Sequence, residues 1–173
     1  MKGESKMAAK SPREVFVMLL SQTRQNTERT AKALQELSEV AQDPDVKEAL
    51  EARIFVSGKN INQIDQCFKL LGETPVKLEG RLHDVFVEDF RRELAEIQNP
   101  VGKFLFVLTK ATQISSLRIA EFTVLTAAAD LSGHYAVGVL LESCLADTKA
   151  FVERTRRMVR IRFEKRIAEK IAA

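Results

Sequence analysis

The chain has 173 residues, of which 45% are hydrophobic and 29% charged, and this balance suits one folded domain rather than a disordered chain. No stretch approaches the roughly 20 apolar residues that a bilayer span needs. The net charge of +3 is unevenly placed, because residues 154–170 carry eight basic and two acidic side chains. Residues 1–10 lack the apolar run of a signal peptide, so we expect a disordered tail there, a single domain over 11–173 and a cytoplasmic location.

The first two helices have clear boundaries in the sequence. Ser11-Pro12-Arg13-Glu14 combines a capping box with a first-turn proline and predicts a helix that runs to about Ala41. Asp43-Pro44-Asp45 predicts a second helix start, with Asp43 as the N-cap. This helix is expected to end at Leu71, because Gly72 can take the left-handed conformation that follows a helix.

The second half of the chain repeats this organisation after a long connection. We expect a short helix over 82–97, a long one from Asn99-Pro100 to Leu131, and a last one from about Tyr135 through the basic segment. Short turns make two antiparallel hairpins, and the connection over 72–99 joins them. The predicted fold is therefore all-α: a ferritin-like four-helix bundle of two hairpins, with a long crossover that carries an extra short helix.

Residues spaced alternately four and three positions apart lie on one face of a helix, and in each long helix such a face is predicted to point into the core. Each of these faces is apolar towards its ends and polar in the middle, which predicts a polar layer halfway along the bundle. The polar members are Thr23, Thr27 and Thr30 in the first helix, Arg53, Ser57 and Asn60 in the second, Ser115 and Arg118 in the fourth, and Asp147 and Arg154 in the last.

A di-metal centre is the chemistry that this position would suggest. Such a centre in a four-helix bundle takes a Glu from each of two helices and a Glu-x-x-His from each of the other two. His83 and His134 have no Glu three residues before them, and both lie near predicted helix ends, far from the layer. Arg53 and Arg118 would also put positive charge where metal cations have to bind. The sequence therefore predicts no metal and no other cofactor.

Three segments resemble the YciE/YciF-type family of bacterial, stress-associated, ferritin-like proteins, over roughly residues 15–158. They are Ala31-Lys32-Ala33-Leu34, the helix end Cys67-Phe68-Lys69-Leu70-Leu71-Gly72-Glu73-Thr74-Pro75, and Ile119-Ala120-Glu121-Phe122 followed by an Ala-rich run and Leu131-Ser132-Gly133. The resemblance implies the ferritin-like fold.

The chain departs from that family at the expected metal ligands. Thr27 stands where the resemblance implies a Glu, and Val56 and Asn60 stand where it implies a Glu and a His. Ser115-Ser116-Leu117-Arg118 replaces a run like Glu-His-Tyr-Glu, and only Asp147 keeps an acid. We therefore expect Arg118 and Asp147 to form a buried ion pair, with Asn60, Ser115 and the threonines completing its hydrogen bonds.

The end of the last helix is basic and carries interleaved apolar residues. Its cations include Arg156, Arg157, Arg160, Arg162, Lys165 and Arg166. Three uses remain open: packing on the bundle or on a second subunit, binding nucleic acid through its cations, or binding a membrane surface or acidic partner.

The chain has no Gly-rich phosphate loop, nucleophile elbow or Cys-x-x-Cys motif, and Cys67 and Cys144 are expected to be buried free thiols. We therefore expect no enzyme, but a metal-free structural or protein-interaction module. It is expected to form a homodimer that covers surplus apolar surface at Phe86, Phe90, Phe104 and Phe106. The alternative is an oxidase or iron-handling protein with an atypical iron or manganese centre.

Overall fold

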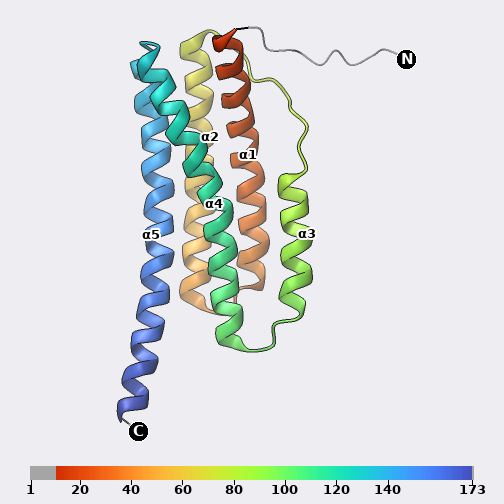
Figure 1. Cartoon of the computed structure of the whole chain (residues 1–173), viewed down its shortest axis with the longest axis vertical. Coiled ribbons are helices and arrows are strands. Elements are labelled where there is room, and N and C mark those ends of the chain that lie inside the picture. The colour runs from red at the N-terminus through yellow and green to blue at the C-terminus, as the bar shows by residue number, and fades with distance from the viewer. Residues whose placement is uncertain (1–10, 173) are drawn as a thin grey trace, which may run out of the picture.

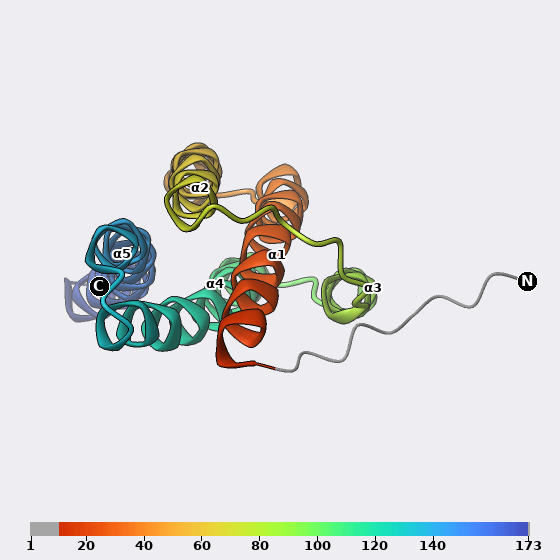
Figure 2. The ribbon, with the colours of Figure 1, turned by 90° about the horizontal axis from the view of Figure 1, so that it is seen from above.

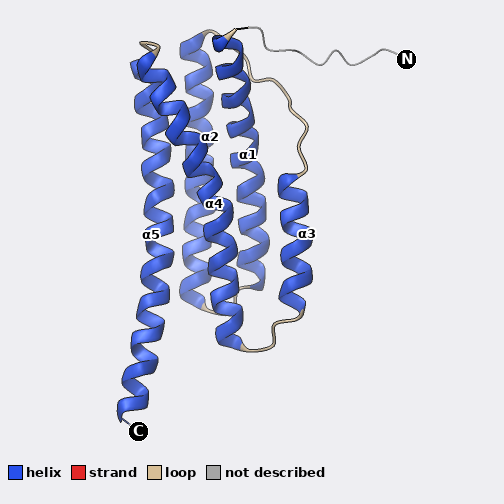
Figure 3. Cartoon of the chain, in the orientation of Figure 1, coloured by secondary structure: helices blue, strands red, loops and turns tan. Residues whose placement is uncertain are grey.

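The computed structural model describes the backbone of residues 11–172 and the side chains of 11–169, and the described residues are helical apart from short connections (Figures 1 and 3). The helices are α1 (Pro12–Val40), α2 (Pro44–Leu71), α3 (Leu82–Ala95), α4 (Pro100–Leu131) and α5 (Tyr135–Ala172). These bounds confirm the predicted ones to within two residues. The tail predicted over residues 1–10 lies outside the described residues.

The helix ends are fixed by the residues that the sequence indicated. The Ser11 side chain accepts from the Glu14 amide while the Glu14 carboxylate accepts from the Ser11 amide, which completes the capping box. Asp43 accepts from the first amides of α2, and Asn99 does the same for α4. Gly72 closes α2 with a φ of 66°, in the left-handed region that glycine enters without a Cβ penalty.

The four long helices form a closed bundle (Figure 2). α1 packs on α2 and α4 on α5, and the contacts of α2 with α5 and of α1 with α4 complete the ring. α3 lies outside this ring, beside α1 and α4. The structure therefore confirms two hairpins joined by a crossover that carries a short helix.

The apolar core is divided into two clusters. One contains Leu20, Ile64, Phe122 and Leu141 with their neighbours. The other contains Leu34, Leu50, Leu108 and Phe90, so α3 contributes to it from outside the ring. Buried polar residues lie between the two clusters, where the sequence predicts the polar layer.

The two residues of α5 that were expected in the polar layer are wrong. Asp147 and Arg154 were expected inward, but the neighbouring Thr148 and Thr155 are buried in their place, while Cys144 is buried as expected. A threonine is the cheaper residue to bury, because its hydroxyl can donate to its own helix: Thr148 Oγ1 donates to the Cys144 carbonyl at 2.8 Å.

The end of α5 projects past the other helices (Figure 1). Its described side chains from Arg160 to Glu169 are all exposed. Phe90 and Phe104, expected to be surplus apolar surface, are instead buried within the chain, and Phe86 and Phe106 are partly buried beside the Lys110 ammonium. None of the helices among the described residues has the length and apolar character of a bilayer span.

Candidate polar core site

A layer of buried polar side chains crosses the middle of the bundle. Its members come from all four long helices: Thr23, Thr27, Thr30, Arg53, Ser57, Asn60, Ser115, Arg118 and Thr148. Of the residues predicted for the layer, Thr27, Asn60, Ser115 and Arg118 have no exposed surface. Hydroxyls alone are easily accommodated here, since Thr27 Oγ1 donates to the Thr23 carbonyl of its own helix. The two arginines are what make the layer unusual.

Arg118 is paired within its own helix. Its Nη2 donates to Glu121 Oε1 at 2.8 Å, and the same oxygen accepts from Asn26 Nδ2 on α1 at 3.0 Å. The guanidinium is fully buried, whereas the Glu121 side chain is 26% exposed. Desolvation lowers the pKa of Arg118 to about 10, although the Glu121 charge opposes that shift. The guanidinium remains charged at neutral pH, so its burial depends on the negative charge of Glu121.

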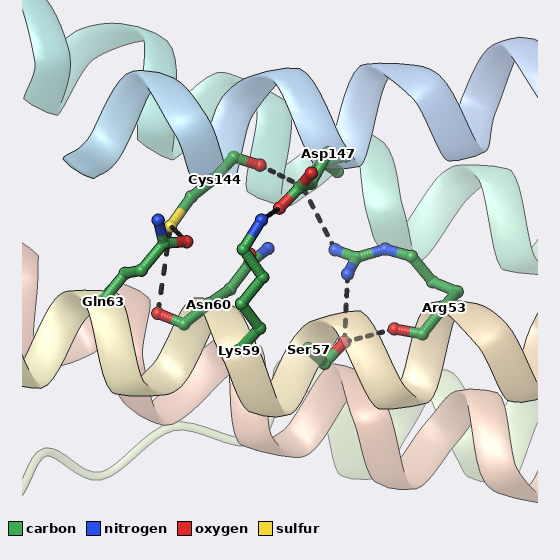
Figure 4. A network of polar contacts seen from close by, with 8 residues as sticks. Arg53, Ser57, Lys59, Asn60, Gln63, Cys144 and Asp147 are labelled. Atoms are coloured by element: carbon green, nitrogen blue, oxygen red, sulfur yellow. Dashed lines mark hydrogen bonds and ion pairs between the residues drawn. The ribbon is translucent and has the colours of Figure 1, made fainter. Parts of the chain in front are cut away.

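The predicted ion pair of Arg118 with Asp147 is wrong. The Asp147 carboxylate accepts from Lys59 Nζ at 2.9 Å, across the contact of α5 with α2, and the Asp147 side chain is 27% exposed (Figure 4). The reason is the orientation of α5 at this level, which turns Thr148 inward and leaves Asp147 at the edge of the layer. The other expected partners also differ, since no hydrogen bond of the structure joins Asn60, Ser115 or Thr27 to either charge among the described residues.

Arg53 is held by hydroxyl groups. Its Nη1 donates to Ser57 Oγ and its Nη2 to Thr148 Oγ1, each at 3.1 Å, across the contact of α2 with α5 (Figure 4). Burial lowers the pKa of Arg53 to about 10, and the nearby charge of Asp147 only partly offsets this shift. Arg53 is thus a buried cation with neutral hydrogen-bond partners.

Several buried polar atoms of the layer make no hydrogen bond within the described residues. The donors are Arg53 Nε, Arg118 Nε and Nη1, Asn60 Nδ2 and the Ser115 hydroxyl. The acceptors are Asn60 Oδ1 and Glu121 Oε2. A buried polar group without a partner costs about 1–3 kcal/mol, and more when it is charged.

The histidine of the crossover lies closer to this layer than its place in the sequence suggested. His83, in the first turn of α3, is 3% exposed, and its Nε2 lies 3.1 Å from Thr30 Oγ1 of α1. Burial lowers its pKa from 6.5 to about 4, and the charges of Arg118 and Arg29 add to this effect. The prediction that His83 lies far from the layer is therefore wrong, because α3 folds back over α1 and α4.

Acidification should loosen this contact. The folded-state pKa of His83 lies below the unfolded value, so its contribution to stability is complete above about pH 6.5 and is lost as pH falls towards 4. The loss amounts to as much as about 3 kcal/mol at 1.36 kcal/mol per pKa unit. Urea unfolding of the protein and of its His83→Gln variant at pH 7 and pH 4 measures it. The two free energies should converge at pH 4, and a difference independent of pH would contradict the assignment.

The donor set of the layer does not match a metal centre. Within residues 11–169, no group of three or more His, Cys, Asp or Glu side chains is placed to hold a metal ion. The two thiols are buried and unbridged, as the sequence indicates, and burial raises the pKa of both Cys67 and Cys144 to about 12. They are therefore poor nucleophiles and poor ligands at neutral pH.

The predicted basic residues lie away from the layer, on the projecting end of α5. Arg156, Arg157, Arg160, Lys165 and Arg166 are exposed. Arg162 is also exposed, but its guanidinium turns towards the bundle, where it pairs with Asp43 at 3.4 Å and stacks over the Phe104 ring.

The closed bundle of two hairpins and the crossover helix define a ferritin-like fold. The chain belongs to the family described as "Domain of unknown function (DUF892)", whose sequence profile matches residues 11–168. This finding confirms the resemblance inferred from the helix-end motifs. A comparison with curated proteins gave no match.

Solved structures share the fold at low sequence identity. The Escherichia coli stress protein YciF is 20% identical, with a TM-score of 0.79 over 86% of this chain and 94% of that one. YcfI of Rhodopseudomonas palustris, described as a putative structural protein, is 21% identical, with a TM-score of 0.81 over 87% and 96%. A protein from Xanthomonas campestris is 19% identical, with a TM-score of 0.66 over 90% and 99%.

Proposed function

We propose that this protein is a metal-free, non-enzymatic member of its family that acts as a structural or protein-interaction module. The observation that carries the proposal is the buried Arg118, because it places a fixed positive charge in the layer where a di-metal centre would need carboxylates. Arg53 adds a second cation, and the neutral residues Thr27, Asn60 and Ser115 supply no negative charge. The two thiols with raised pKa values offer no nucleophile in exchange.

The similar proteins support this proposal only in general terms. YciF is described as a stress protein and YcfI as a putative structural protein. Sequence identities of 20–21% show that these proteins share the fold of this chain, but they do not show that they share its role. A stress-associated, structural and cytoplasmic role for this chain is therefore part of the proposal.

An iron-oxidation assay tests the proposal against its alternative, an oxidase with an atypical centre. Ferrous iron is added to the aerobic protein, and the rise in ferric absorbance is compared with that in buffer alone. We expect equal rates, because the positively charged guanidinium groups of the layer would repel ferrous ions. A rate that saturates with iron and scales with protein concentration would establish the oxidase.

We further propose that the protein forms a homodimer through apolar residues left exposed in the monomer. Leu131 is 90% exposed, Tyr135 69% and Val139 70%, and all three lie around the turn that joins α4 to α5. Light scattering coupled to size exclusion should give the mass of two chains. A Leu131→Ser variant should shift that mass towards one chain, whereas a single-chain mass for the unmodified protein would reject the dimer.

Nucleic-acid binding is a second candidate, favoured by the projecting basic end. Arg156 and Arg160 are 81% and 77% exposed, although each also pairs with a glutamate of its own helix. Neutralising phosphates makes binding strongly salt-dependent. A gel shift with duplex DNA that weakens steeply between 50 and 200 mM salt, roughly as phosphate contacts predict, would support this candidate. No shift at the lower salt concentration would dismiss it.

A further inference from the structure

A cavity opens at the end of the bundle opposite the α4–α5 turn (Figure 1). It lies between the α1–α2 turn, the first two turns of α4 and one side chain of α5, and its volume is about 300 Å³. This volume is at the lower end of the range for small-molecule sites, roughly 300–1,000 Å³. None of the residues that line the cavity belongs to the polar layer, so it is a separate candidate site.

The floor of the cavity is apolar and belongs to the folded core. Val46, Phe104 and Val107 line it, and their exposed fractions are 1%, 7% and 2%. All three side chains are members of the core cluster that includes Leu34 and Phe90. The core therefore holds the floor in place without a ligand, and the floor favours the apolar part of any molecule that enters.

The rim of the cavity carries more positive than negative charge. Its charged lining residues are Lys103, Arg162 and Asp43. Lys103, in the first turn of α4, is half-buried and makes no hydrogen bond or ion pair among the described residues. Arg162 holds its guanidinium 5.4 Å from the centre of the Phe104 ring, directly beside the apolar floor. Two cations and one acid leave one positive charge at the rim.

Asp43 is already committed to other groups. Its Oδ1 accepts from the amides of Asp45 and Val46 at the start of α2, and its Oδ2 accepts from Arg162 Nη1 at 3.4 Å. The other N–H groups of Arg162 make no hydrogen bond among the described residues. A carboxylate at the rim can therefore accept from both Lys103 and Arg162, and such charge-assisted hydrogen bonds are the stronger kind.

A wider cavity borders this one and shares Val40 and Lys103 with it. Its lining also contains Glu36 and Glu39, and its further cation, Arg91, is paired with Glu36. These acids would repel an anion. The smaller cavity is therefore the better site for a negatively charged group.

We propose that the smaller cavity binds a short, unbranched carboxylic acid. The carboxylate lies between Lys103 and Arg162, and the tail lies on the floor of Val46, Phe104 and Val107. The single positive charge at the rim matches a monoanion. This ligand site goes beyond the proposed structural role, and it lies at the other end of the bundle from the apolar surface around Leu131, so its failure leaves the dimer proposal untouched.

Octanoate is the probe, because it combines one carboxylate with a short apolar tail. Titration of the isotope-labelled protein with sodium octanoate should shift the amide NMR signals around Val46 and Val107 along a saturating curve. Octanol, which lacks the charge, and octylammonium, which reverses it, should bind at least about tenfold more weakly. Equal binding of the three molecules, or no saturating shift with octanoate, would overturn the site.

Variants of the rim and the wall separate the charge from the cavity. Lys103→Met should weaken octanoate binding at least about tenfold and leave octanol binding unchanged. Lys149→Met, which removes an exposed lysine away from the cavity, is the matched control and should bind octanoate normally. Ala41→Trp, which fills the cavity from its wall, should abolish the binding of both molecules.

Two results from these variants would contradict the proposal. One is an unchanged octanoate affinity in Lys103→Met. The other is a dimer that Ala41→Trp converts to a single chain in light scattering, because a second copy of the chain would then be the occupant of the cavity.

Discussion

Replacing Glu121 by Gln should lower the free energy of unfolding by about 3–5 kcal/mol, the cost of leaving a buried charge without its partner. Arg118 is fully buried, and its ion pair in the structure is with Glu121, at 2.8 Å. The glutamine amide keeps the size and one acceptor oxygen of the carboxylate, so the change removes charge with little loss of packing. Urea denaturation at pH 7 with circular dichroism measures the difference.

Asp147→Asn is the matched control for this experiment. It removes the other acid near the layer, but its ion pair with Lys59 lies at the edge of the bundle, where the two side chains are 27% and 52% exposed. Exposed pairs contribute roughly 0–1 kcal/mol. A larger loss from Asp147→Asn than from Glu121→Gln would contradict the assignment of Glu121 as the main counter-charge of the layer.

Phe90→Ala should cost about 3–5 kcal/mol, the usual range for truncation of a buried aromatic side chain. Phe90 is 1% exposed and belongs to the core cluster of Leu34, Leu50 and Leu108, against which Phe86 of α3 also packs. It also packs on Phe86 of the same helix, with ring centroids 6.0 Å apart. The prediction therefore treats the crossover helix as part of the folded core.

Phe55→Ala supplies the comparison, because Phe55 is 82% exposed on α2. Its loss should change stability by no more than about 0.5 kcal/mol, as for other surface substitutions. Chemical denaturation at neutral pH measures both variants. If Phe90→Ala lowered the free energy of unfolding as little as Phe55→Ala, α3 would be only weakly packed on the bundle and would not be part of its core.

The helix boundaries were predictable because their causes are local. Ser11, Asp43 and Asn99 cap the amides that directly follow them, and Gly72 supplies the conformation that ends α2. No knowledge of tertiary structure is needed to see these signals. The inward-facing residues of α1, α2 and α4 were also predictable, because a long helix repeats the same spacing of core residues over many turns.

The polar contacts were harder to predict because they depend on side-chain register. On α5, Asp147 and Thr148 are adjacent polar residues, and a pattern that fits one fits the other nearly as well. The predicted partner of Arg118 was on another helix, although Glu121 lies three residues further along the same helix face. This three-residue spacing is visible in the sequence and could have predicted the ion pair of Arg118 with Glu121.

His83 shows a different limit. Its burial depends on how the crossover returns along the bundle, which the loop composition does not determine. In the structure, the Val76 amide donates to Ser21 Oγ and the Leu78 amide to Gln25 Oε1, so α1 fixes the path of the loop. Such contacts join residues more than 50 positions apart, beyond the reach of any local pattern.

Metal loading shows whether guanidinium groups and neutral donors fill the layer where a ferritin-like di-metal centre would lie. The protein is incubated without oxygen with ferrous iron and, separately, with manganese, passed through a desalting column and analysed for metal by mass spectrometry. We expect only trace metal to stay with the protein, and loading to leave Tm unchanged. Stoichiometric metal that survives the column and raises Tm would contradict this expectation.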